Sequence, residues 1–186
     1  MKFPFALLAL AICPLYSVAA ENLTPYGNFE APASELKPFV SSTFAKMSFV
    51  QEHPGDNHCV KVEVTTISQN KDGTQGVHAN AICKFQLEPD TNYHFSFDLK
   101  GSAPRFLIDL KEEDGRKLAL KFIPEPPVKT AYHEIIGDWK EYKGTFRTKK
   151  GGQYQLFVTL WHNTYYGKMF YSVGDYFLLD NLKIWK

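Results

Sequence analysis

Two carboxylates near opposite ends of the chain have the chemistry of metal ligands. Asp180 interrupts an otherwise apolar, strand-like run over residues 174–184, and Glu30 directly follows an aromatic residue near the start. Burying a carboxylate is costly unless it is paired or binds a metal. If the terminal strands meet, the two residues could share a cation. The alternative is that Glu30 pairs with a lysine and Asp180 caps a turn.

A second set of residues could form an aromatic surface with polar neighbours. Over residues 154–161, aliphatic side chains alternate with a set that contains Phe157 and Trp161. Flat aromatic rings stack against the apolar faces of sugar rings, and nearby polar side chains bond the hydroxyls. The alternative is that Trp161 belongs to the core, where aromatic residues dominate burial. With their neighbours and the non-core set of residues 77–86, the candidates are Trp161, Phe157, Tyr165, Tyr166, His78, Asn80 and Asn163.

The known catalytic motifs are missing. Glycoside hydrolysis needs two positioned carboxylates, but Glu112, Glu113 and Asp114 precede a glycine and are expected at a solvated hairpin tip. The chain has neither a Gly-x-Ser-x-Gly elbow nor the His-Glu-x-x-His spacing of a metalloprotease. We therefore expect that the chain is not an enzyme.

The first twenty residues have the pattern of a secretory signal peptide. Lys2 is followed by the apolar stretch 5–12 and by small residues at 18–20. The apolar stretch is too short to span a membrane. We expect cleavage near Ala20, which leaves residues 21–186 as a single secreted or periplasmic domain.

The charge balance excludes some classes of partner, and two cysteines raise the question of a disulfide. The sequence has 21 Lys and Arg against 20 Asp and Glu, a balance that provides no field for nucleic acid or an anionic membrane. Cys59 and Cys83 could form a disulfide in an oxidising compartment. The alternative is two buried thiols, because strand alternation places Cys83 with apolar neighbours but Cys59 with Lys61.

Alternating hydrophobicity dominates the chain between turn-rich stretches, and helical periodicity is nearly absent. This pattern predicts an all-β fold, an antiparallel β-sandwich of the jelly-roll type. The expected strands lie within 59–65, 77–86, 93–100, 106–110, 118–122, 139–146, 154–161 and 177–184.

Five segments together resemble the CenC-like carbohydrate-binding modules, which have a galactose-binding-like jelly-roll fold. They are Gly-Asn-Phe-Glu at 27–30, the turn and strand at 56–62, the turn and strand at 87–101, Trp-Lys-Glu-Tyr-Lys-Gly-Thr-Phe at 139–146, and Phe-Leu-Leu-Asp-Asn-Leu-Lys-Ile at 177–184. The order of these segments along the chain is similar to that in the family.

The resemblance implies a non-catalytic module that binds a polysaccharide or glycan in an aromatic-lined groove. It also implies a structural calcium held by Glu30 and Asp180, with backbone carbonyls of residues 56–58 completing the site, and it places Trp139 in the core. Any glycoside hydrolase activity would reside in a partner protein. The alternative is a structural or interaction protein of the cell envelope that has the same fold and binds no sugar.

Overall fold

A computed structural model of the chain describes residues 22–24, 27–30, 45–53, 57–123, 133–134 and 137–186. The predicted signal peptide lies outside the described residues. Within them, no helix is long and apolar enough to cross a membrane.

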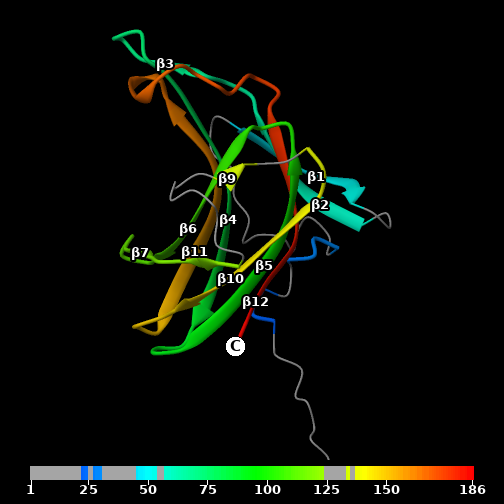
Figure 1. Cartoon of the computed structure of the whole chain (residues 1–186), viewed down its shortest axis with the longest axis vertical. Helices are drawn as coiled ribbons and strands as arrows, with labels where there is room; N and C mark the ends of the chain where they lie inside the picture. The colour runs from blue at the N-terminus through cyan, green and yellow to red at the C-terminus, as the bar shows by residue number, and fades with distance from the viewer. Residues whose placement is uncertain (1–21, 25–26, 31–44, 54–56, 124–132, 135–136) are drawn as a thin grey trace, which may run out of the picture.

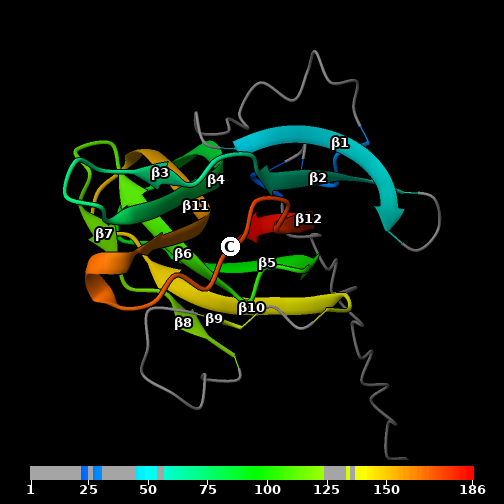
Figure 2. The same cartoon turned by 90° about the horizontal axis from the view of Figure 1, so that it is seen from above.

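The protein is an all-β sandwich of two antiparallel sheets in the jelly-roll class (Figure 1). The first sheet has the order β3 (Ser68–Gln69), β4 (Gln75–Leu87), β11 (Gly152–Asn163), β6 (Arg105–Glu112) and β7 (Lys117–Leu118), and β9 (His133–Glu134) also pairs with β6. The second sheet has the order β1 (Ala45–His53), β2 (Asn57–Val64), β12 (Tyr176–Trp185), β5 (Asn92–Gly101), β10 (Lys140–Arg147) and β8 (Lys121–Phe122). Figure 2 shows the second sheet as a stack from β1 to β10, with β4, β11 and β6 in the other layer.

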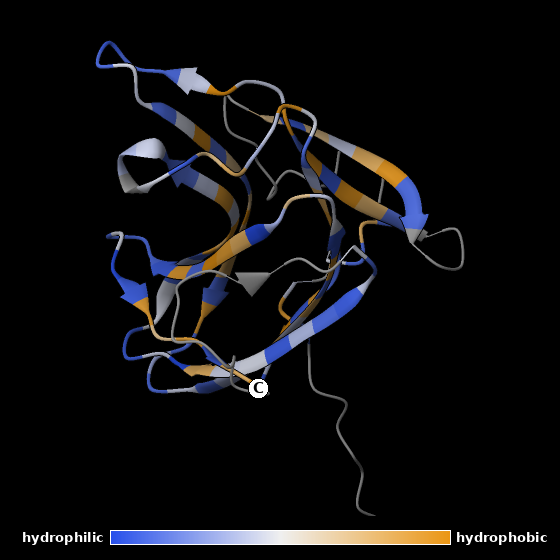
Figure 3. Cartoon of the chain, turned by 45° about the horizontal axis from the view of Figure 1, so that its top comes forward, coloured by the Kyte–Doolittle hydropathy of each residue, from blue (hydrophilic) through white to orange (hydrophobic). Residues whose placement is uncertain are grey.

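The core lies between the sheets and follows the predicted alternation. Successive side chains of a strand point to opposite faces, and the strands accordingly show alternating hydrophilic and hydrophobic bands (Figure 3). The predicted core sets are confirmed, because each of their members is buried: Val77, Ala79, Ala81, Cys83 and Phe85 on β4; Tyr93, Phe95, Phe97 and Leu99 on β5; Phe106, Ile108 and Leu110 on β6; Tyr154, Leu156, Val158 and Leu160 on β11.

The two long strands of the first sheet, β4 and β11, are curved. They bow toward the second sheet, so the face of the first sheet that points away from the core is concave (Figure 1). We call this surface, formed by the outward side chains of β4, β11 and β6, the concave face.

Three features differ from the sequence prediction. The expected return strand over 118–122 is divided, because Leu118 pairs with β6 of the first sheet whereas Lys121 pairs with β10 of the second. Strand β1 was not predicted. Trp139 is half-buried and outside the core cluster, and its ring N–H donates to the Glu52 carbonyl at 3.3 Å.

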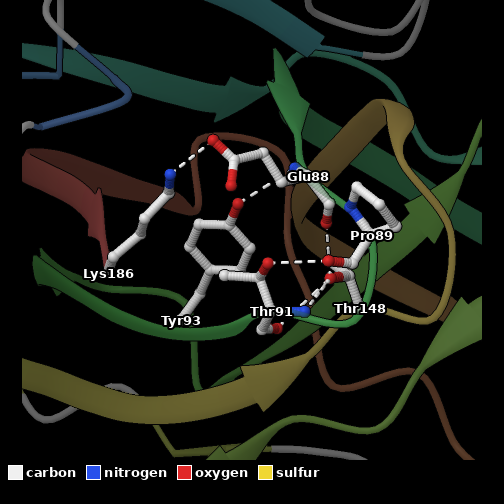
Figure 4. Close-up of polar contacts among 6 residues, drawn as sticks. All are labelled: Glu88, Pro89, Thr91, Tyr93, Thr148 and Lys186. Atoms are coloured by element: carbon white, nitrogen blue, oxygen red, sulfur yellow. Dashed lines mark hydrogen bonds and ion pairs between the residues drawn. The ribbon is translucent and has the colours of Figure 1, made fainter.

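A buried threonine ties the strand ends together at one end of the sandwich (Figure 4). The Thr148 hydroxyl donates to the Glu88 carbonyl at 2.7 Å and accepts from the Thr91 N–H at 3.1 Å. The Glu88 N–H in turn donates to the Tyr93 hydroxyl at 3.0 Å, and the Glu88 carboxylate binds Lys186. These bonds link the turn between β4 and β5 to the end of β10 and to the C-terminus.

Candidate functional site

The concave face collects four of the predicted carbohydrate-contacting residues. Trp161 and Phe157 have the same parity on β11, opposite to the buried aliphatic residues of that strand. The antiparallel register places His78 beside Trp161 and Asn80 beside Thr159. The tertiary structure therefore brings these side chains together, and the half-buried rings of Trp161 and Phe157 lie outside the core cluster.

Asn80 is the most unusual polar residue of this face. It is only 4% exposed, and its Nδ2 lies 3.2 Å from His78 Nε2. Its Oδ1 has no hydrogen-bond partner among the described residues. A buried amide group without a partner costs about 1–3 kcal/mol, and a ligand hydroxyl could recover this cost.

The protonation of His78 suits this contact. Burial, and to a smaller extent the positive charge of Lys111, lowers the pKa of His78 below its ordinary value of 6.5. The imidazole is therefore neutral at pH 7. A neutral ring can accept a hydrogen bond from the Asn80 amide or donate one to it.

Phe157 lies among charged groups that the sequence analysis did not select. Its register partners are Ile82 on β4 and Asp109 on β6. Lys111 Nζ lies 4.2 Å from the centroid of the Phe157 ring, and Asp109 binds Lys117 Nζ at 2.8 Å. The alternation of residues 106–110 already placed Asp109 opposite the core set, and Lys111 continues this parity. That alternation was the available signal for both residues.

The segment after β11 carries the remaining candidates. The Asn163 side chain accepts from the Tyr165 N–H at 2.8 Å and caps the short 3-10 helix η1 (Thr164–Tyr166). Asn163 therefore has a structural role in addition to its place beside Trp161. Tyr165 is 80% exposed. The side chain of Tyr166 lies outside the described residues.

The two ends of the domain meet, which is the condition for Glu30 and Asp180 to share a cation. Leu23 N–H donates to the Ile184 carbonyl at 2.8 Å, and Leu182 N–H donates to the Gly27 carbonyl at 2.8 Å. The Thr24 hydroxyl also donates to the Leu182 carbonyl at 2.8 Å. Residues 23, 24 and 27 are thereby hydrogen-bonded to β12.

The predicted calcium ligands have different surroundings. Glu30 is exposed, accepts from the His58 N–H at 2.7 Å and lies 3.1 Å from His58 Nδ1. The hydrogen bond with the His58 side chain lowers the pKa of Glu30, which burial opposes weakly. Asp180 is 1% exposed, and its Oδ1 accepts from the Asn181 N–H at 2.6 Å.

These surroundings limit how a calcium ion could be held. Among the described residues, no three His, Cys, Asp or Glu side chains are grouped as metal ligands. Glu30 and Asp180 would therefore need backbone carbonyls and water to reach the six to eight oxygen ligands that calcium takes. Residues 54–56 lie outside the described residues. Residue 56 would supply one of the backbone carbonyls that were expected to complete the site. Calcium binding stays a prediction.

Both described cysteines are free and buried, so the disulfide alternative is wrong and the two-thiol alternative holds. Cys83 lies in the core cluster, whereas Cys59 has the opposite parity to the core valines of β2. The two side chains therefore occupy opposite sides of the second sheet. Burial raises the pKa of Cys59 to about 11 and that of Cys83 to about 12.

The expected solvated hairpin tip also needs a correction. Glu113 and Asp114 are exposed, but Glu112 is 7% exposed. Its two carboxylate oxygens accept from Arg116 Nη2 at 2.7 and 2.9 Å. Glu112 follows the core parity of β6, which is why it points inward rather than into solvent.

Comparisons with known proteins identify the fold. No protein-family model matches the chain, and no curated protein matches it in sequence. Among solved structures, TmCBM61 in complex with β-1,4-galactotriose is similar with a TM-score of 0.57 and 14% identity, over 90% of this chain and 99% of that one. The tandem CBM22-1–CBM22-2 domain of Paenibacillus barcinonensis Xyn10C gives 0.55 and 11% identity, over 90% and 46%.

A viral protein has a similar fold. The enzymatically active domain of tailspike protein 4 of bacteriophage CBA120 gives a TM-score of 0.55 at 11% identity, over 88% of this chain. The present chain spans only 21% of that domain and about half of the tandem module. At these identities the comparisons support the fold of carbohydrate-binding modules. They do not support the CenC-like family in particular.

Proposed function

We propose that the chain is a secreted, non-catalytic carbohydrate-binding module that binds a polysaccharide or glycan chain across its concave face. The observation that carries this proposal is the buried, half-satisfied amide of Asn80 on the same face as Trp161 and Phe157. Aromatic surface with a few convergent polar groups is the usual composition of a small-molecule site.

The spacing of the aromatic residues suits an extended ligand. Trp161 and Phe157 are four residues apart on one strand, which separates their Cα atoms by about 13 Å. Thr159 and Asn80 lie side by side between them, as the register shows. Stacking at the two ends and hydrogen bonding in the middle would bind a chain of sugars better than a single ring.

The known neighbours support this class of ligand. TmCBM61 was solved with β-1,4-galactotriose, so this fold can hold an oligosaccharide. We therefore propose β-1,4-galactan as the first polymer to test, together with xylan, mannan and mixed-linkage glucan. A glycoside hydrolase would be supplied by a partner protein.

Affinity electrophoresis of residues 21–186 against these polymers tests the proposal. We expect retardation by one polymer class and its loss in Trp161→Ala, with a nearly unchanged melting temperature. Trp139→Ala is the matched control, because it removes the same side chain from a half-buried position outside the first sheet. It should leave retardation intact.

A second variant examines the polar part of the site. Asn80→Leu removes the unpaired amide but keeps a similar volume. We expect weaker retardation and no loss of thermal stability, because a buried polar group without a partner is removed. If Trp161→Ala and Asn80→Leu both bind every retarding polymer like the wild type, the concave face is not the site. Absence of retardation across a broad panel would favour an interaction protein of the cell envelope.

A further inference from the structure

A second pocket lies at one edge of the sandwich, outside the concave face. It has a volume of about 650 Å³, which is within the range of about 300–1,000 Å³ for small-molecule sites. Residues from β5 and β10 and from the segment that crosses from β7 to β8 line it. The buried aromatic rings of Tyr93 and Phe146, stacked 5.4 Å apart, contribute its apolar part. We call this the edge pocket.

Positively charged side chains outnumber negatively charged ones in the edge pocket. Its ionisable side chains other than His94 and Tyr93 are Arg116, Lys117, Lys121, Arg147, Lys149 and Glu112. Glu112, the one carboxylate among these described side chains, forms an ion pair with Arg116. Lys117 is paired with Asp109, which belongs to the concave face.

Three cations of the pocket have no counter-charge of their own among the described residues. Within the described part of the chain, no carboxylate lies within ion-pair distance of Lys121, Arg147 or Lys149. All three are exposed at the pocket. Because a concave surface lined by one sign of charge concentrates the field, this pocket attracts anions.

Neutral donors and acceptors accompany these cations. Asn92 and Thr145 also line the pocket. An amide and a hydroxyl are the groups expected beside sugar hydroxyls, whereas the guanidinium of Arg147 can hold a carboxylate or sulfate through two parallel hydrogen bonds. The combination suits a sugar that carries a negative group rather than a bare inorganic ion.

We propose that the edge pocket binds the carboxylate or sulfate group of an acidic saccharide, so that the ligand of this protein is an acidic polysaccharide. The saccharide part of this inference rests on the proposed function. Lys117 connects the two surfaces, since it lines the pocket and binds Asp109, the register neighbour of Phe157. One glycan chain can thus cross the concave face and place a charged residue in the pocket.

A titration with small anions tests the pocket directly. Amide chemical shifts of isotope-labelled residues 21–186 are followed with glucuronate, galactose 6-sulfate and inorganic sulfate, with methyl glucoside as the neutral control. We expect saturable shifts at Arg147, Lys149 and Lys121 with an acidic sugar, and none with methyl glucoside. The acidic sugar that saturates these shifts at the lower concentration shows whether the pocket prefers a carboxylate or a sulfate group. Shifts with inorganic sulfate alone, or with no anion, would overturn the proposal.

Charge reversal separates a specific pocket from general attraction. Lys121→Glu/Arg147→Glu is compared with Lys71→Glu/Lys183→Glu, which makes the same change of net charge at exposed lysines outside the pocket. We expect the first pair to weaken acidic-sugar binding about ten-fold or more and the second less than about two-fold. Equal losses in both pairs would show non-specific attraction and overturn the proposal.

A polymer pair distinguishes this inference from the proposed function. Polygalacturonate and its fully methyl-esterified form share one backbone and differ in charge, as dextran sulfate and dextran do. Tighter binding of a charged member, lost in Lys121→Glu/Arg147→Glu, supports the pocket. If charged and uncharged polymers bind equally well and this binding depends on Trp161, the pocket proposal is overturned. The proposed carbohydrate-binding function is then unaffected. If the small anions bind at the pocket but Trp161→Ala changes no polymer binding, the concave face fails instead.

Discussion

Gly27 and Leu182 lie backbone against backbone where the two ends of the domain meet. Leu182 N–H donates to the Gly27 carbonyl at 2.8 Å. A Cβ atom on residue 27 would lie 1.8 Å from the Leu182 carbonyl oxygen. The glycine of the Gly-Asn-Phe-Glu segment is thus required by a close approach of two chain segments that are far apart in the sequence.

Gly27→Ala should destabilise the domain by about 3 kcal/mol or more, because backbone atoms must move to admit the methyl group. Urea unfolding of residues 21–186 measures this change. Gly137→Ala is the control, since a Cβ at that position meets no atom of the described residues within 4 Å. A Gly27→Ala variant as stable as the control would contradict the close packing of the two ends.

Thr148→Val should lower the free energy of unfolding by about 1–3 kcal/mol. It keeps the shape of a fully buried side chain but leaves the Thr91 N–H and the Glu88 carbonyl without the hydroxyl that they share. Thr66→Val, at an exposed position, should change stability by less than about 0.5 kcal/mol. Equal effects of the two substitutions would show that the buried hydroxyl contributes nothing.

The two thiols should be unreactive in the folded protein. At pH 8, a thiol with a pKa of about 11 is ionised to only about one part in a thousand, and burial also blocks the reagent. We expect no reaction of residues 21–186 with Ellman's reagent until denaturant is added, and then reaction of both Cys59 and Cys83. Rapid reaction before unfolding would contradict the burial, and failure to react after unfolding would indicate a disulfide.

The same thiols make stability depend on alkaline pH. Their folded pKa values of about 11 and 12 lie above the ordinary value of 9.0. Above about pH 9 the unfolded chain loses protons that the folded chain keeps, so stability falls as the pH rises. Cys59→Ala should flatten the pH dependence of the melting temperature between about pH 9 and pH 11. An unchanged slope would show that Cys59 is not the group responsible.

Calcium binding can be tested through Glu30. If Glu30 and Asp180 share a calcium ion, a chelator should lower the melting temperature by removing a ligand of the folded state. Calcium should restore it, and Glu30→Gln should abolish both effects. Glu63→Gln is the control, because Glu63 pairs with Lys61 and lies outside the proposed site. A wild-type melt that responds to neither chelator nor calcium, with metal content measured as absent, would refute the prediction.

The sequence predicted the core well because alternation is a local property. A strand that places Val77 inward must place His78 outward, so the shared parities of His78 with Asn80 and of Phe157 with Trp161 follow from the chain itself. The resemblance, and not the alternation rule, was wrong at Trp139: it suggested a core anchor, but the ring lies half-buried beside Glu52. Strand β1 was missed since its alternating Met47 and Phe49 are only half-buried.

Which strands become neighbours was decided by the tertiary structure. Residues 118–122 read as one strand, yet hydrogen bonding divides them between two sheets, and their crossing lines the edge pocket. Glu112 was expected at a solvated tip. In the structure it is buried and forms an ion pair with Arg116.

The sequence by itself therefore determined the fold class and the faces of the strands. Only the tertiary structure decided that Asn80 is buried beside Thr159 with half of its amide unpaired, and that Lys121 and Arg147 border one pocket. The physical reason is the distance along the chain over which each property is determined. Strand alternation is set by neighbouring residues, whereas burial and electrostatic surroundings depend on contacts between segments distant in the chain.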